Sequence, residues 1–145
     1  MSYEELITNY SLLLNEKGEW PVFHDAEILS VNCCSMVSED DGKGYAYLTI
    51  GPTLAITLEL CAEENPYVVT LQFSGCINVN MNNFGYVNDI NDLSIDIQER
   101  GTFTNGEPLP PYLVVNFEKL SYGLNFKCFE IEAVSRLNES LLGCE

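Results

Sequence analysis

The sequence predicts an α+β fold in which one N-terminal helix packs on a mostly antiparallel β-sheet of about six or seven strands. Three observations predict it: residues 2–15 carry apolar side chains at helical spacing, most later segments alternate apolar and polar residues, and turn-forming residues separate these segments. Helical segments are too few for the crossovers that a parallel sheet requires. With 145 residues, of which 46% are hydrophobic, the chain is expected to form a single globular domain over residues 1–145.

The N-terminal segment is expected to be helical over residues 2–15. Ser2 can cap this helix, and Glu5, three residues later, completes a capping-box pattern. Gly18 is expected to end the segment in a left-handed conformation. The apolar residues share one helical face, which we expect to cover the sheet, and they are Leu6, Ile7, Tyr10, Leu13 and Leu14.

The strands are predicted from side chains that alternate between apolar and polar along the chain. Gly51 and Pro52 are expected to end one strand and to separate it from the next. The apolar positions change parity at Cys128–Phe129, which predicts a β-bulge that turns the later side chains toward the core. The expected strands cover residues 29–33, 45–50, 54–60, 67–77, 93–97, 113–117 and 124–133.

Polar segments rich in turn-forming residues are expected to connect the strands. Residues 38–44 and 62–66 are acidic and contain glycine or proline. Residues 78–92 are rich in asparagine, whose side chain bonds nearby backbone and whose backbone tolerates left-handed angles. Residues 100–111 contain two glycines and three prolines and are expected to form a loop.

The chain is strongly acidic, with 22 acidic residues against six basic ones and a net charge of −16. This charge argues against nucleic acid as a partner, because phosphate contacts need Lys and Arg, and against an anionic membrane surface. It favours solubility, or attraction to a basic partner whose association an acidic face accelerates. The acidic surface candidates are Glu39, Asp40, Asp41, Glu63, Glu64, Asp89 and Asp92.

Nothing at the start of the chain predicts export. MSYEELITNY has no basic or long apolar region, and no later run is long enough for a membrane span, so we expect a cytoplasmic protein. The six cysteines form no C-x-x-C motif and are expected to be buried free thiols. One histidine cannot complete a zinc finger, and residues 88–92 lack EF-hand spacing, so we expect no metal and no cofactor.

The stretch WPVFHDAEILSV, residues 20–31, holds the strongest candidates for a functional site. Trp20 is expected either in the core or, if exposed, at the centre of an interface. His24, the chain's only histidine, stands beside Asp25 and near Glu27, so it could act as a general base. No nucleophile motif accompanies it. The simpler interpretation is that His24 and Asp25 hold the loop by hydrogen bonds, or contact a partner.

WPVFHDAEI resembles the signature of the bacterial immunity protein 50 family, in which a Trp-Pro-x-Phe-His-Asp-Ala-Glu-like segment precedes the first strand. Later features that agree with the resemblance are a central strand with Leu71-Gln72-Phe73, an asparagine-rich turn, Asn116-Phe117-Glu118 and Leu124-x-Phe126-x-Cys128. The resemblance covers roughly residues 3–134, and its distinctive part is Trp20–Glu27.

The resemblance implies an immunity protein, not an enzyme, that binds a cognate toxin of a bacterial polymorphic-toxin system and neutralises it by stoichiometric occlusion. The acidic charge matches a basic nuclease as the toxin. Trp20, His24, Asp25 and Glu27 would bind the toxin or organise the loop. Two alternatives remain: a small hydrolase or metal-dependent enzyme centred on His24, Asp25 and Glu27, and a homodimeric structural or assembly protein. A monomer and a homodimer are both compatible with the sequence.

Overall fold

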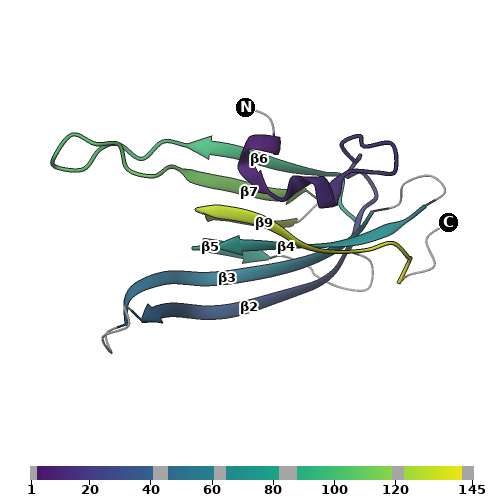
Figure 1. Cartoon of the computed structure of the whole chain (residues 1–145), viewed down its shortest axis with the longest axis horizontal. Coiled ribbons are helices and arrows are strands. Elements are labelled where there is room, and N and C mark those ends of the chain that lie inside the picture. Colours follow the sequence, from purple (N-terminus) through teal and green to yellow (C-terminus); the bar gives the residue numbers. More distant parts are fainter. Residues whose placement is uncertain (1–2, 41–45, 61–64, 82–87, 119–122, 142–145) are drawn as a thin grey trace.

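The computed structural model describes residues 3–40, 46–60, 65–81, 88–118 and 123–141 (Figure 1). Within them the chain forms a five-stranded sheet in the order β1-β9-β4-β3-β2 and a four-stranded sheet in the order β5-β8-β7-β6. The elements are α1 (Tyr3–Leu6), β1 (Ile7–Thr8), the 3₁₀ helix η1 (Tyr10–Leu13), β2 (Glu27–Asp40), β3 (Ala46–Leu60), β4 (Tyr67–Ser74), β5 (Ile77–Met81), β6 (Asp92–Gln98), β7 (Tyr112–Glu118), β8 (Gly123–Cys128) and β9 (Glu130–Leu137).

Two sheets, and not the expected single one, form because a two-stranded ribbon turns a corner. The β4–β5 segment bends at Gly75, which has a φ of 71°, and the β8–β9 segment bends at Phe129. The Phe129 N–H donates to the Ser74 carbonyl at 2.9 Å, so the ribbon stays hydrogen-bonded through the bend. A β-bulge was predicted at Cys128–Phe129 from the change of parity. The structure has a bend there instead, at which the chain passes from one sheet into the other.

The core lies between the two sheets and is built from their inward-facing side chains. Phe73 of β4 packs edge-to-face on Phe126 of β8 at a centroid distance of 4.9 Å and on Phe117 of β7 at 6.0 Å. All three rings are buried. Their offset and edge-to-face contacts, in addition to their buried area, stabilise the packing of one sheet on the other.

The N-terminal helix expected over residues 2–15 is present only as the single turn α1. Ile7 and Thr8 instead form β1, which pairs in parallel with β9, and Asn9 takes a left-handed φ of 60° before η1 begins. Two physical reasons account for the break. Ile7 and Thr8 are β-branched and suit a strand, and a lone short helix is only marginally stable without extensive packing. The apolar side chains of Ile7 and Leu13 are nevertheless buried.

Two residues of the large sheet hold the end of η1. The Tyr67 hydroxyl donates to the Leu13 carbonyl at 2.6 Å, and the Arg136 guanidinium donates to the carbonyls of Leu12, at 3.1 Å, and Leu14. The same guanidinium stacks over the Tyr67 ring at 4.0 Å. Burial raises the pKa of Tyr67, so its hydroxyl remains a donor at neutral pH. Three successive carbonyls that the short helix leaves without helical partners are thus satisfied.

The predicted break at Gly51–Pro52 is wrong, because β3 continues through it. Pairing of β3 with β4 ends at Thr53, so Pro52 lies just past the end of that ladder, where its carbonyl accepts the Cys76 N–H at 2.8 Å and its missing N–H is not needed. The β2–β3 ladder contains register shifts nearby. A proline that donates no backbone hydrogen bond is tolerated at such an edge. The loop expected to begin at residue 38 is also shortened, since β2 continues to Asp40; residues 41–45 lie outside the described residues.

The asparagine-rich stretch expected to be a turn is partly a strand, because its first residues belong to β5. The strands expected around residues 93–97 and 113–117 are confirmed as β6 and β7. No helix among the described residues has the length and hydropathy to cross a membrane.

The cysteines only partly follow the prediction of buried thiols. Cys76 and Cys128 are buried and free, and burial raises the pKa of their thiols to about 11 and about 12. Cys33 and Cys34 are free but exposed, because β2 is an edge strand with a neighbour on only one side. The remaining two cysteines, Cys61 and Cys144, lie outside the described residues.

Candidate protein-binding face

Trp20 lies at the junction between the N-terminal segment and the loop that enters β2. Its indole contacts the ring of Tyr3 edge-to-face at 5.4 Å and the ring of Phe23 at 6.2 Å. Phe23 is buried, whereas Trp20 is half-buried. Trp20 therefore packs on the core with part of the residue accessible at the surface, and its role at an interface stays a prediction.

The side chains of His24 and Asp25 project into solvent, with 63% and 69% of their areas exposed. His24 Nε2 and an Asp25 carboxylate oxygen are 3.7 Å apart. The loop is held instead by backbone groups: the Asp25 N–H donates to the Ile90 carbonyl, and the Ala26 N–H donates to the Phe23 carbonyl, both at 2.9 Å. Asp25 adopts a left-handed φ of 66°, which aspartate tolerates better than most residues. The observed loop contacts are thus those of the backbone, and the role expected of the His24 and Asp25 side chains, in the loop or in contact with a partner, stays a prediction.

Glu27 is the member of the predicted cluster that does organise the loop. Its Oε1 accepts a hydrogen bond from the Asn88 N–H at 2.8 Å, and its backbone pairs with Asp89. The start of β2 is thereby joined to the segment that precedes β6. The Glu27 carboxylate is therefore bonded to the Asn88 backbone. Among the described residues, no group of three or more His, Cys, Asp or Glu side chains is arranged to hold a metal ion.

Tyr3 joins the N-terminal segment to the outer edge of β6. Its hydroxyl donates to the Leu93 carbonyl at 2.9 Å and accepts from the Ile95 N–H at 3.2 Å. The hydroxyl therefore caps two backbone groups on the side of β6 that faces away from β7. Burial raises the pKa of Tyr3, and the carboxylates of nearby acidic residues raise it further. These residues are Asp92, Asp96 and Glu118.

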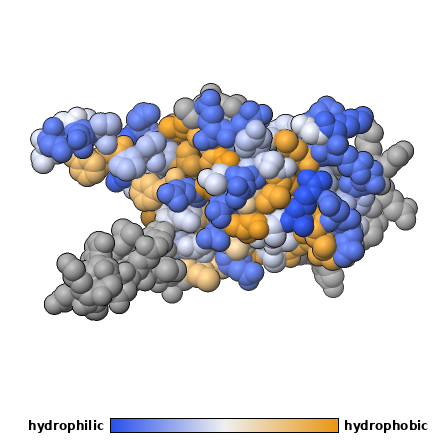
Figure 2. All heavy atoms as spheres, viewed as in Figure 1, coloured by the Kyte–Doolittle hydropathy of each residue, from blue (hydrophilic) through white to orange (hydrophobic). Residues whose placement is uncertain are grey.

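Exposed carboxylates lie on the segments that meet near the Trp20–Tyr3 pair, and we call them the acidic face. The Tyr3 hydroxyl bonds α1 to β6, and the Asp25 N–H bonds the loop before β2 to the Ile90 carbonyl. Asp92 of β6 pairs with Glu118 of β7, so two of the acidic residues are neighbours across these strands. No Lys or Arg of the described part of the chain forms an ion pair with these carboxylates. Figure 2 shows hydrophilic residues over α1 at the top of the view. The acidic face comprises Glu4, Glu5, Asp25, Asp89, Asp92, Asp96 and Glu118.

Of the acidic candidates named from the sequence, Asp89 and Asp92 are exposed and belong to this face. Glu39 and Asp40 lie in β2, and the structure describes their backbone only. Asp41, Glu63 and Glu64 lie outside the described residues. Sequence reasoning missed Tyr3, Asp96 and Glu118 as site residues. Asp96 carried a signal, since it stands on the polar side of an alternating strand, but nothing local brings Tyr3 to it.

A separate open pocket of about 420 Å³ lies near the end of β9. Glu16 and Arg136 are among its lining residues, together with Asn65 and Glu139. The Asn65 amide donates to Glu16 at 2.8 Å, and Arg136 is engaged by the carbonyls at the end of η1. None of the residues singled out from the sequence lines this pocket.

The acidic face therefore combines a half-buried aromatic pair with a rim of exposed carboxylates, an arrangement that suits contact with a basic protein surface. The chain matches no protein-family model, no curated protein and no solved structure.

Proposed function

We propose that this chain is an immunity protein, which binds a cognate bacterial toxin in the cytoplasm and neutralises it by stoichiometric occlusion. The observation that carries the proposal is the acidic face around Trp20 and Tyr3. The WPVFHDAE segment, which resembles the immunity protein 50 signature, contributes to that face and supports the proposal. Its Trp20 supplies the aromatic centre, its Asp25 supplies an exposed carboxylate, and its Glu27 fixes the adjoining backbone.

Electrostatics favour a basic partner. Seven exposed carboxylates lie on the segments that meet near Trp20 and Tyr3, in a chain whose net charge is −16, so the acidic face would attract cationic surfaces and accelerate encounter with them. A nuclease that binds phosphate groups presents such a surface, and an acidic inhibitor that covers it would exclude the substrate. The half-buried Trp20 adds apolar contact at the centre, where interface residues contribute most to affinity.

The proposal is tested by using the chain as bait in lysate of its native host at low and at high salt. We expect one basic protein, bound in a 1:1 ratio and released by salt, because the screening length of exposed charges falls from about 10 Å at 0.1 M salt to about 3 Å at 1 M. That protein should inhibit bacterial growth when expressed alone, and co-expression of this chain should restore growth. If no toxic protein is captured at either salt concentration, the immunity function is refuted.

Matched charge variants separate the acidic face from the overall charge. Asp92→Asn with Asp96→Asn removes two charges from the face, and asparagine keeps the oxygen that accepts the Leu93 N–H. Glu130→Gln with Glu132→Gln removes two exposed charges from β9 in the other sheet. We expect the first pair to slow association several-fold and to flatten its salt dependence, and the second to change both much less. Equal effects of the two pairs would contradict a localised contact.

A further inference from the structure

The segment between β6 and β7 forms a hairpin that projects beyond both sheets, and we call residues 99–111 the arm (Figure 1, left). Its two sides are paired: Thr102 bridges Pro108, and the Leu109 N–H donates to the Gly101 carbonyl at 2.9 Å. At the turn, the Phe103 N–H donates to the Glu107 carbonyl at 2.7 Å. Residues 101–108 are all exposed, so the arm is ordered without burying a core of its own.

A stack of cationic and aromatic side chains fixes the base of the arm. The Arg100 guanidinium lies 4.5 Å from the centroid of the Tyr112 ring and 5.3 Å from that of Phe129. Its Nη1 also donates to the Pro110 carbonyl at 3.2 Å. The Tyr112 and Phe129 rings are 5.0 Å apart, so the arm is joined to the corner where β8 passes into β9. These contacts set the direction in which the arm projects.

Local backbone chemistry limits the motion of the arm further. Asn105 Oδ1 accepts the Glu107 N–H at 3.0 Å, which closes the turn. Gly101 and Gly106 have φ values of 98° and 88°, a conformation that other residues adopt only with strain. Three prolines on the return side fix further backbone angles. A segment that is already ordered loses little conformational entropy on binding, so the arm is preorganised to meet a partner.

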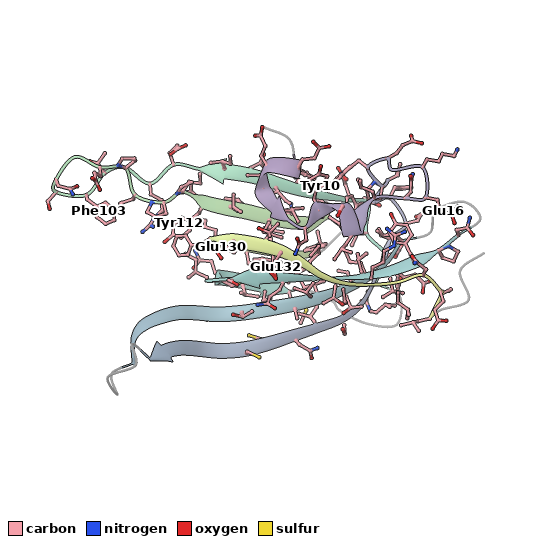
Figure 3. The ribbon with its side chains drawn as sticks, viewed as in Figure 1. Tyr10, Glu16, Phe103, Tyr112, Glu130 and Glu132 are labelled. Carbon is pink, nitrogen blue, oxygen red and sulfur yellow. The ribbon has the colours of Figure 1, made fainter. Side chains whose placement is uncertain are left out.

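Phe103 is the residue that the arm presents. Its side chain is 49% exposed, and Figure 3 shows it toward the far end of the arm, away from Tyr112 at the base. An aromatic residue on a projecting turn that is half exposed leaves apolar area in contact with water. The same ring, placed in a pocket of a partner, is the kind of side chain that contributes most to affinity.

We propose that the arm enters the concave active site of the toxin, where Phe103 fills an apolar pocket within a basic cleft. This inference rests on the proposed function. The charges of the arm point to a basic cleft: Glu99 and Glu107 are exposed, whereas its one cation, Arg100, is half-buried against the rings at the base. The arm also continues the acidic face, because β6 carries Asp92 and Asp96 and leads directly into the arm. The arm occludes the cleft while the acidic face lies against its rim.

The test compares Phe103→Ala with the wild-type chain, using the purified toxic protein recovered by the wild-type bait. We expect Phe103→Ala to raise the Kd at least tenfold and to reduce growth rescue, because loss of a buried aromatic anchor has an effect of that order or larger. Phe103→Tyr keeps the ring and should stay within about threefold of wild type. Val134→Ala, a change at an apolar side chain of β9 that is 41% exposed, is the matched control and should not alter the Kd.

The outcomes separate the arm from the function. Thermal unfolding should give nearly the same Tm for Phe103→Ala as for the wild type, since Phe103 lies outside the hydrophobic core, so a loss of affinity could be distinguished from a loss of fold. If Phe103→Ala binds as tightly as wild type while the Asp92/Asp96 pair weakens binding, the arm proposal is overturned and the immunity function stands. If the wild-type chain recovers no toxic protein, both are overturned.

Discussion

Arg136 offers the sharpest test of how this fold holds its N-terminal segment. Arg136→Lys keeps the positive charge but loses the planar guanidinium. That group donates to the carbonyls of Leu12 and Leu14 and to Asn138 Oδ1, and it stacks on the Tyr67 ring. A lysine ammonium is compact and cannot reproduce this fork. Both carbonyls accept from one nitrogen, Nη1, whereas the bond from Nε to Asn138 Oδ1 and the stack on Tyr67 need the rest of the planar group and are lost in Arg136→Lys.

The expected cost is about 2 kcal/mol of unfolding free energy. Loss of one hydrogen bond from a charged donor accounts for about 1.5 kcal/mol, and a weaker cation–π contact at a half-exposed site accounts for about 0.5 kcal/mol. For a chain of this length, that cost lowers the Tm by roughly 4–8 °C. Urea unfolding followed by the fluorescence of Trp20, the chain's only tryptophan, measures it directly.

Arg100→Lys is the matched control. Arg100 also stacks on aromatic rings, but it bonds a single exposed carbonyl at the base of the arm, so its replacement should cost less than about 1 kcal/mol. Hydrogen exchange adds a local readout, because the amides of Leu12 and Leu14 should lose protection in Arg136→Lys. A loss below about 0.5 kcal/mol in Arg136→Lys, or equal losses in both variants, would refute the view that the guanidinium anchors η1.

Two further predictions concern stability. Tyr3→Phe keeps the ring contact with Trp20 but removes both hydrogen bonds to β6, and it should cost about 1–2 kcal/mol with an unchanged urea m value; a cost near zero would show that the hydroxyl does not secure the edge. Stability should fall as the pH rises from 9 toward the pKa values of about 11 for Cys76 and about 12 for Cys128, because the unfolded chain loses these protons first. Urea unfolding at stepped pH measures this effect, and Cys128→Ala should weaken the dependence.

The sequence predicts the strands well because their alternation reflects which side faces the core. β6 and β7 fall where the pattern places them. What alternation cannot convey is which sheet a strand belongs to. The bends at Gly75 and Phe129 lie within continuous patterns, and the parity change at Cys128–Phe129 has the same local appearance whether a strand bulges or crosses between sheets.

The candidate site is only partly predictable for a similar reason. Trp20 and Asp25 could be named from one short segment, as could Asp89 and Asp92 from their charge. Their convergence depends on the bond between the Asp25 N–H and the Ile90 carbonyl, a contact between residues far apart in the chain. The prediction of a long N-terminal helix was wrong because apolar spacing alone does not identify a helix. Here β-branched residues and the left-handed Asn9 divide the segment into short pieces with the same spacing.

The hydrogen-bonded ribbon that passes from one sheet to the other has a consequence for folding. The ribbon consists of two segments, β4–β5 and β8–β9, which are separated in sequence by the whole of β6 and β7. They can pair only after the long segment between them has closed into a loop. Closure of such a loop is entropically costly and slow, which places this chain among proteins of high contact order. Once formed, the ribbon ties the two sheets together, because each of its two continuous segments places one strand in each sheet.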